Sequence, residues 1–228
     1  MKHFFRRTRL AAAVLPFLLA ASAACDIAMV DHREKATEEW TKTYDIQAGG
    51  RVEIANVNGK VDVRPGDGTK VEVVAQKTAS GQTQEAAREA LKGIEITEEA
   101  TASSLKIGTK MQRSGGLFNH GSLQVVYTVR VPATMEVHLS TVNGGLEITG
   151  VQGKIVAETT NGGVKARDIG GAIEATATNG GVDVDLARVV EGIKLETVNG
   201  GVVLRLPTDA KATIAARVVN GGIETSGL

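Results

Sequence analysis

A repeated corner motif, Asn-Gly-Gly, constrains the fold of this chain more than any other feature of its sequence. The motif occurs five times between Val137 and Thr225, with successive asparagines 18, 18, 20 and 21 residues apart, and an earlier copy reads Asn58-Gly59-Lys60. The six corner asparagines are Asn58, Asn143, Asn161, Asn179, Asn199 and Asn220. A period of this length is typical of folds that stack one short unit on the next.

Apolar and polar side chains alternate on both sides of each corner. When the copies are aligned on the asparagine, the positions six and four residues before it are apolar, as are nearly all those three and five residues after it. The first of these positions holds Val52, Val137, Ile155, Ile173, Ile193 and Ile214. A period of two predicts strands with one buried face, and no helical period of 3.6 fits.

Each corner combines a stiff residue with a permissive one. The residue before the asparagine is always β-branched, which favours an extended strand up to the corner. The residue after it is always glycine, and Asn-Gly tolerates the positive φ that a sharp change of direction requires. The β-branched residues are Val57, Val142, Thr160, Thr178, Val198 and Val219.

Two architectures satisfy this pattern: a β-solenoid of stacked coils, and a meander of hairpins with type I′ Asn-Gly turns. The nearly constant period favours the solenoid, as does a second corner of variable length at 150–153, 168–171, 187–192 and 207–211. We therefore predict an all-β solenoid with rungs of about 18–21 residues and one short helix. In it, equal positions would stack about 4.8 Å apart and the asparagine amides would form a ladder.

The first 24 residues predict a secretory signal peptide. A basic start is followed by an apolar segment at 10–21 and by small residues up to Ala24. This apolar segment is too short to span a membrane, which takes about 20 residues. Cys25, the only cysteine, follows Ser22-Ala23-Ala24 and resembles the acylated cysteine of bacterial lipoproteins. We predict export and lipidation at Cys25; simple cleavage that leaves a free thiol is the alternative.

The predicted domain plan has three parts: a signal peptide at 1–24, the lipidated Cys25 with a charged tether at 25–43, and a β-solenoid domain at 44–228. Residues 83–92 form the only helix candidate, because four alanine and leucine residues make a narrow apolar stripe there. The glycine-rich segment 111–122 is expected to be an exposed loop. Trp40, near the end of the tether, is expected to pack against the first strand.

No residue pattern indicates catalysis, a cofactor or a metal. His32, His120 and His138 have no partner at ligand spacing, and the alternation around His138 predicts a position on the outer face. Asp183 and Asp185 share one strand face, but a pair next to a corner does not indicate acid–base chemistry. We predict that the chain is not an enzyme and has no catalytic residues, no metal ligands and no cofactor.

Composition narrows the choice of partners. Lys plus Arg equals Asp plus Glu at 26 each, and without the signal peptide the acids outnumber the bases. A mildly acidic body argues against nucleic acid as a partner. The repeats from Val137 onward contain no Phe, Trp or Tyr, which argues against a sugar-binding cleft. Phe118 is the only aromatic residue in an evident loop, where a partner contact is the alternative to a solvated loop.

The whole pattern resembles the bacterial putative-adhesin family, a family of unknown function also found near envelope-stress operons. The resemblance covers about residues 44–228: an early strand pair with Asn58-Gly59, a short helical insertion, a long strand ending at Val131-Pro132, and serial Asn-Gly rungs. It implies a β-solenoid, export and membrane anchoring, and it offers no catalytic residues.

These observations predict a lipid-anchored envelope protein, periplasmic or on the cell surface, with a non-catalytic, adhesin-like solenoid. Its expected partners are the membrane, through the lipid, and an envelope or surface protein. A second copy that pairs with the terminal rung is a further expected partner, because an uncovered rung offers unpaired backbone groups. The alternatives are a polysaccharide-active solenoid enzyme and an accessory protein in envelope stress sensing.

Overall fold

A computed structural model describes residues 33–66, 68–112, 121–189, 192–208 and 217–226. The signal peptide, Cys25, His32, Phe118 and His120 lie outside the described residues, so their predicted roles stay predictions. In the part of the chain that the structure describes, no helix is both long and apolar enough to cross a membrane.

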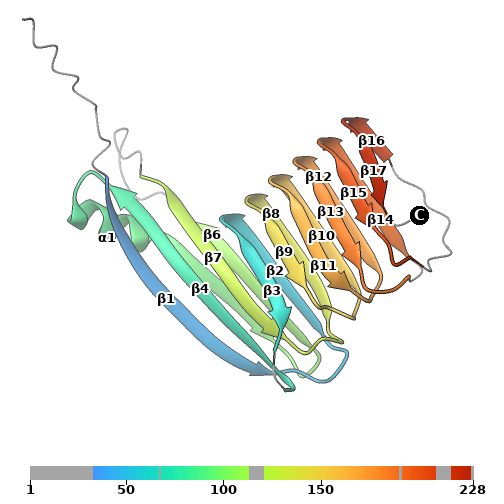
Figure 1. Cartoon of the computed structure of the whole chain (residues 1–228). Coiled ribbons are helices and arrows are strands. Elements are labelled where there is room, and N and C mark those ends of the chain that lie inside the picture. The colour runs from blue at the N-terminus through green and yellow to red at the C-terminus, as the bar shows by residue number, and fades with distance from the viewer. Residues whose placement is uncertain (1–32, 67, 113–120, 190–191, 209–216, 227–228) are drawn as a thin grey trace, which may run out of the picture. The chain divides into compact units, whose positions relative to one another are not determined.

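Six rungs form the repeating part of the domain (Figure 1). Each rung has one strand in each of two facing sheets, and the Asn-Gly corner connects the two strands. The rungs are β2 (Arg51–Asn58) with β3 (Val61–Pro65), β8 (Glu136–Asn143) with β9 (Leu146–Thr149), β10 (Ile155–Asn161) with β11 (Val164–Ile169), β12 (Ile173–Asn179) with β13 (Val182–Leu186), β14 (Ile193–Asn199) with β15 (Val202–Arg205), and β16 (Arg217–Asn220) with β17 (Ile223–Ser226).

Equivalent strands pair in parallel, with the corner asparagines in register. Asn161 lies opposite Asn143 on one side and Asn179 on the other. A meander of hairpins would pair neighbouring strands antiparallel, so that alternative is wrong and the solenoid is confirmed. The first copy also joins the stack: Asn58 pairs with Asn143, although the two asparagines are 85 positions apart in the chain.

The insertion between the first and second rungs lies beyond the first rung, not between the two. It comprises β4 (Lys70–Gly81), α1 (Gln84–Leu91), β5 (Ile94–Ala100), β6 (Ser104–Met111) and β7 (Leu123–Val131). Strands β6 and β7 pair in parallel with β2 and β3, and so continue the stack by one more layer. Antiparallel strands then end it, with β5 beside β6 and β4 beside β7.

The predicted tether needs correction. Residues 34–45 form β1 (Glu34–Asp45), which pairs antiparallel with β4 along its whole length and forms the outer edge of its sheet. Its many charged residues hid it from a search for apolar alternation, because an edge strand with only Ala36 fully buried needs little apolar surface. The sheet therefore begins ten residues before the predicted start at Tyr44, and Trp40 packs partly buried against the core from within β1.

Helix α1 lies within the predicted segment 83–92 and is one residue shorter at each end. The Thr83 side chain accepts a hydrogen bond from the Ala86 amide at 3.2 Å and caps the first turn. Ala87, Ala90 and Leu91 are buried, and the helix packs on β4 and β1. The helix thus covers the antiparallel end of the domain.

The core is a continuous column of inward side chains between the two sheets. The positions six residues before and three residues after each corner are fully buried in the middle rungs, as with Ile155 and Val164 at 0% exposure. Between them lie small residues such as Ala157, Ala166 and Ala175, also at 0%. Burying each large aliphatic side chain contributes roughly 1.5–3 kcal/mol, so stability is spread over the rungs rather than concentrated at one place.

The corner glycine is required for a reason that the sequence did not reveal. A Cβ on Gly144, Gly180 or Gly200 would lie about 2 Å from the glycine carbonyl oxygen of the preceding rung, although none of the three has a φ in the left-handed region. The second glycine has more space, since a Cβ on Gly145 would be 3.6 Å from its nearest neighbour. Close stacking of backbones is thus common to all six corners, whereas a positive φ adds to the requirement for glycine only at Gly59, Gly162 and Gly221.

Candidate interaction surfaces

The asparagine ladder occupies the corner edge of the stack. The Nδ2 atoms of Asn161, Asn179, Asn199 and Asn220 each donate to the Oδ1 atom of the asparagine one rung earlier, at 2.8–3.0 Å. Asn58 is in register but bonds differently, because its amide donates to the Leu123 carbonyl in β7. The hydrogen-bonded ladder therefore has five members, from Asn143 to Asn220, and these side chains are exposed.

Buried threonine hydroxyls form hydrogen bonds with the backbone of the corners. Thr159 and Thr197 lie two residues before their asparagines and donate to the carbonyls of Gly144 and Gly180, one rung earlier, at 3.0 and 2.8 Å. Thr141 occupies the same position but its buried hydroxyl has no hydrogen-bond partner. The Asn56 amide already donates to the Gly59 carbonyl, the acceptor that the pattern would assign to Thr141. The corner carbonyls of Gly59, Gly144 and Gly180 thus each accept a hydrogen bond from a side chain, which comes from the same rung at Gly59 and from the next rung at Gly144 and Gly180.

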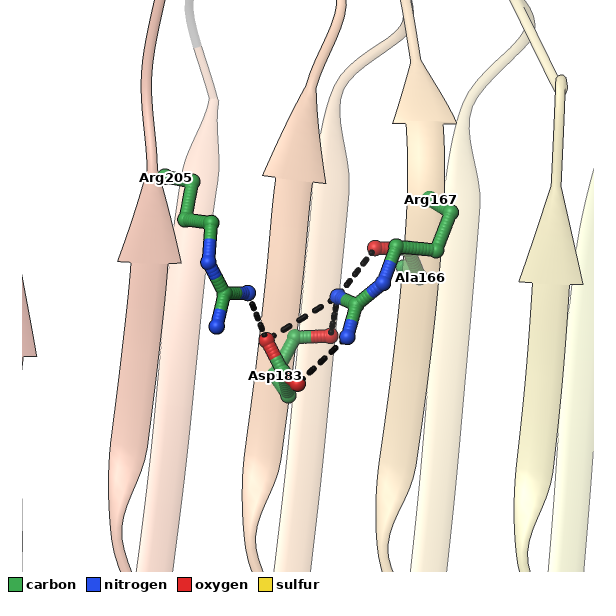
Figure 2. Close-up of polar contacts among 4 residues, drawn as sticks. All are labelled: Ala166, Arg167, Asp183 and Arg205. Carbon is green, nitrogen blue, oxygen red and sulfur yellow. Dashed lines mark hydrogen bonds and ion pairs between the residues drawn. The ribbon is translucent and has the colours of Figure 1, made fainter. Parts of the chain in front are cut away.

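The outer face of the sheet that contains β11, β13 and β15 carries a charged cluster of Arg167, Asp183 and Arg205 (Figure 2). Arg167 binds the Asp183 carboxylate with two nitrogens, one of them 2.9 Å from Oδ1, and Arg205 binds the same Oδ1 from the other side. These bonds, first those from Arg167, hold the pKa of Asp183 below its usual range although partial burial opposes the shift. One carboxylate therefore connects three successive rungs.

A second charged cluster lies on the same face toward the first rung. Arg64 binds the Asp62 carboxylate through two bonds of 2.8 Å, and Lys60 bridges Asp62 and Glu147. Burial raises the pKa of Asp62, but the bonds from Arg64 and Lys60 outweigh it and the net shift is downward. Opposite charges of this cluster are thus paired within a rung, as in Arg64–Asp62, and across rungs, as in Lys60–Glu147.

The outer face of the other sheet is hydroxyl-rich and carries a shallow groove of about 430 Å³. Ser140, Glu158 and Thr176 form one column, and the β-branched residues before the asparagines form the next. In that second column Val142 and Val198 are 45% and 40% exposed. The groove is lined by Asn56, Ser140, Thr141, Val142, Glu158, Thr159, Thr160, Thr176 and Thr178.

Two titratable residues singled out in the sequence, Asp183 and His138, are each bonded to charged neighbours. Asp183 and Asp185 do share an outer face, but both Asp183 oxygens are bound by guanidinium groups. His138 lies half-buried on the outer face, as predicted, with Nε2 2.8 Å from Glu136 Oε1. Among the described residues, no group of three or more His, Cys, Asp or Glu side chains is placed to hold a metal ion.

The two ends of the stack differ. At the β1/β5 end, Lys42 and Tyr44 of β1 both bond the carboxylate of Glu98 in β5, so side chains connect the two sheet edges. At the β16/β17 end, Ile223 is 49% exposed and Val219 is 63% exposed. The residues equivalent to Ile223 in the other rungs are at most 1% exposed: Val61, Leu146, Val164, Val182 and Val202.

These features define an all-β solenoid domain whose outer faces repeat the same polar columns from rung to rung. The chain belongs to the Toastrack DUF4097 family, whose model matches residues 41–227. The family-level prediction made from the Asn-Gly rungs is therefore confirmed. A comparison with curated proteins gives no match.

Three solved structures are similar to this chain over most of their length. A putative cell adhesion protein from Clostridium sporogenes is 12% identical, with 83% of this chain and 99% of that chain covered and a TM-score of 0.39. A putative adhesin from Bacteroides fragilis is 11% identical, with 82% and 97% covered and a TM-score of 0.36. A putative lipid binding protein from Parabacteroides distasonis is 9% identical, with 83% and 95% covered and a TM-score of 0.28.

Proposed function

We propose that this protein is exported, held at a membrane by a lipid on Cys25, and serves there as a non-catalytic interaction module. One observation carries the non-catalytic part: carboxylates on the charged face are held by basic side chains, from neighbouring rungs at Asp183 and from the same rung at Asp62. Asp183 is bound by Arg167 and Arg205, and Asp62 by Arg64 and Lys60. Carboxylates held in this way strengthen the stack and have depressed pKa values, which makes them poor general acids at neutral pH.

The repeated faces suit contact with an extended surface better than capture of a small molecule. The groove on the hydroxyl-rich face is open along several rungs and has exposed β-branched residues beside it. Small-molecule sites are usually enclosed and bury most of their ligand. The sequence supports the anchor, through the signal-like residues 1–24 followed by Cys25.

The first test is the mass of the mature protein purified from membranes, beside a Cys25→Ala variant. We expect a mass that corresponds to an acylated Cys25 at the N-terminus and release of the variant into the soluble fraction. A Cys25→Ser variant is the matched control, because it keeps the size of the side chain but not the thiol. An unmodified chain that was cleaved before Cys25 and keeps a free thiol there would overturn the anchor. Turnover of polysaccharides by the purified domain would overturn the non-catalytic role.

A second role, self-association, is favoured by the exposed last rung. Parallel rungs bond through backbone amides, as when Gly200 donates to the Asn220 carbonyl and Val202 donates to the Gly222 carbonyl, at 2.9 and 3.0 Å. In the last rung the equivalent donors belong to Gly221 and Ile223, and the described chain provides no further rung to accept from them. Unpaired edges that also expose an apolar residue are templates for strand addition.

We propose that a second copy of the chain pairs with the β16/β17 edge. In that copy the β1 edge is charged and mostly exposed, whereas its β16/β17 edge has the same unpaired donors and the same exposed Ile223. Two identical edges can pair around a twofold axis. Sedimentation of the wild type should show dimers that increase with concentration, and Ile223→Lys should lower their fraction. A monomer at all concentrations would overturn this role and leave the anchor proposal untouched.

A further inference from the structure

The six Asn-Gly corners are chemically alike, and only one of them lacks a hydrogen bond that the other five share. In Asn-Gly sequences the glycine nitrogen can attack the side-chain carbon Cγ of the asparagine. The nitrogen–Cγ bond forms, the Cγ–Nδ2 bond breaks, and ammonia leaves to give a cyclic imide. Water then opens the ring to aspartate or isoaspartate, so that one water is consumed for each ammonia released. The reaction requires no enzyme or cofactor.

In five corners the attacking nitrogen is held by the next rung. The amides of Gly59, Gly144, Gly162, Gly180 and Gly200 donate to the carbonyls of Asn143, Asn161, Asn179, Asn199 and Asn220, respectively, at 2.7–3.0 Å. An amide that donates along the strand-pairing direction must give up this bond before its nitrogen can turn toward Cγ. The reaction is therefore limited by local opening of the stack, which is unfavourable in the interior of a cooperative array.

The sixth corner, Asn220-Gly221, has no such restraint. Among the described residues nothing accepts a hydrogen bond from the Gly221 amide, because β17 pairs only with β15. Asn220 is exposed, its Nδ2 donates to Asn199 at 3.0 Å, and within the described part of the chain no donor bonds its Oδ1. The four preceding asparagines of the ladder are exposed as well, so exposure alone does not separate the corners.

We propose that Asn220 is a site of spontaneous deamidation in the folded protein, and that the next-rung hydrogen bond protects the other five corners. Conversion changes the last position of the ladder from an amide to a carboxylate. The donor to Asn199 Oδ1 is lost, and a negative charge appears at the edge where a further strand would pair. The site is thus a one-way chemical change at the open end of the stack.

Trypsin separates the six sites, because Lys or Arg lies between every pair of corners. The peptides are 52–60, 131–154, 155–165, 168–188, 195–205 and 218–228, each with one Asn-Gly. The full-length protein is incubated at mildly alkaline pH, digested briefly, and the amide-to-acid mass change is followed in each peptide. A parallel incubation in denaturant gives the intrinsic rate of every corner from the same chain.

In the folded protein we expect peptide 218–228 to convert at least about tenfold faster than each of the other five, as protection by local opening requires. In denaturant the six rates should converge to within about threefold, since all six corners place a β-branched residue before Asn-Gly. An Asn220→Ser variant should leave Asn199 protected, because the Gly200 amide still donates to the backbone carbonyl of residue 220.

Two results would overturn the proposal. One is conversion of Asn143, Asn161, Asn179 or Asn199 in the folded protein at a rate comparable to that of Asn220. The other is an Asn220 that reacts in denaturant but not in the folded protein. The assay reports bond formation at single residues, so it does not depend on the lipid anchor, on a partner or on self-association.

Discussion

A terminal strand leaves backbone groups and apolar side chains without a neighbouring rung, and the two ends of the solenoid differ in how these groups are covered. At the β1/β5 end the parallel stack stops at antiparallel strands, α1 packs on β1 and β4, and Glu98 connects the two edges through Lys42 and Tyr44. At the β16/β17 end the last rung has the same Asn-Gly corner and an apolar residue three positions after it, yet this residue, Ile223, is 49% exposed. The repeated sequence therefore specifies the contacts between one rung and the next. Covering an end of the stack takes residues outside the repeat, here those of β1, β4, β5 and α1.

The corner glycines should give the largest effect. Gly144→Ala would put a Cβ 2.1 Å from the Gly59 carbonyl oxygen, so the rungs must separate. We expect a loss of about 3 kcal/mol or more in unfolding free energy, measured by denaturant titration, as for other overpacked or strained sites. Gly145→Ala is the matched control, and Gly222→Ala, with nothing within 4 Å, tests the open end. Equal losses in the three variants would contradict the close-stacking explanation.

Truncation of core residues should distinguish the interior from the open end. Ile155→Ala removes a side chain with 0% exposure and should cost about 2–5 kcal/mol in unfolding free energy. Ile223→Ala removes one that is 49% exposed, so we expect less than about 1 kcal/mol at low protein concentration. If the loss for Ile223→Ala rises with concentration, a second copy covers the edge. A large, concentration-independent loss would mean that the last rung is already covered within the chain.

The hydrogen bonds from Lys42 and Tyr44 to Glu98, which connect the two sheet edges at the β1/β5 end, should contribute less to the unfolding free energy. Tyr44→Phe removes the hydroxyl that bonds Glu98 and should cost about 0.5–1.5 kcal/mol, since the ring still packs against the core. Hydrogen exchange of β1 and β5 amides should increase more than that of β12 and β13. Thr43→Val is the control, because Thr43 is exposed and lies between the two bridging residues. Uniform exchange changes along the stack would show that the bridge does not act at this end.

The smallest effect should come from the charged cluster and should depend on pH. The pKa of Asp183 is lowered in the folded protein, so its contribution to stability is present above the unfolded pKa of about 3.9 and is lost as pH falls through the lower folded value. Because the carboxylate is partly exposed, we expect about 1 kcal/mol or less.

Asp183→Asn tests this contribution through thermal unfolding at pH 7 and at pH 3. The variant should be less stable than the wild type at pH 7, and the difference should shrink at pH 3. Thr149→Val, at an exposed position on the same outer face, provides a variant whose effect should not change with pH. A difference that stays constant from pH 7 to pH 3 would mean that the ion pairs contribute nothing to stability.

Local residue patterns determined much of this structure. Alternation placed the strands of all six rungs, the β-branched-Asn-Gly sequence placed the corners, and Ala86, Ala87, Ala90 and Leu91 predicted the helix. These features can be predicted from the sequence because they depend on residues close together in the chain. A strand with one buried face needs apolar residues at every second position, and a tight corner needs glycine. The alignment of Asn58 with the later corners was also correct, since stacking requires the same side chains at the same positions.

Only the tertiary structure decided the contacts that join distant parts of the chain. It placed the charged residues of β1 at a sheet edge, inserted β6 and β7 beyond the first rung, and turned the Asn58 amide toward Leu123. It also brought Arg167 and Arg205 to Asp183. A comparison of charged residues at offset positions in successive repeats could have suggested this cluster. A sequence specifies which residues are to be buried and where the chain turns, but which edges meet depends on packing between segments far apart in the chain.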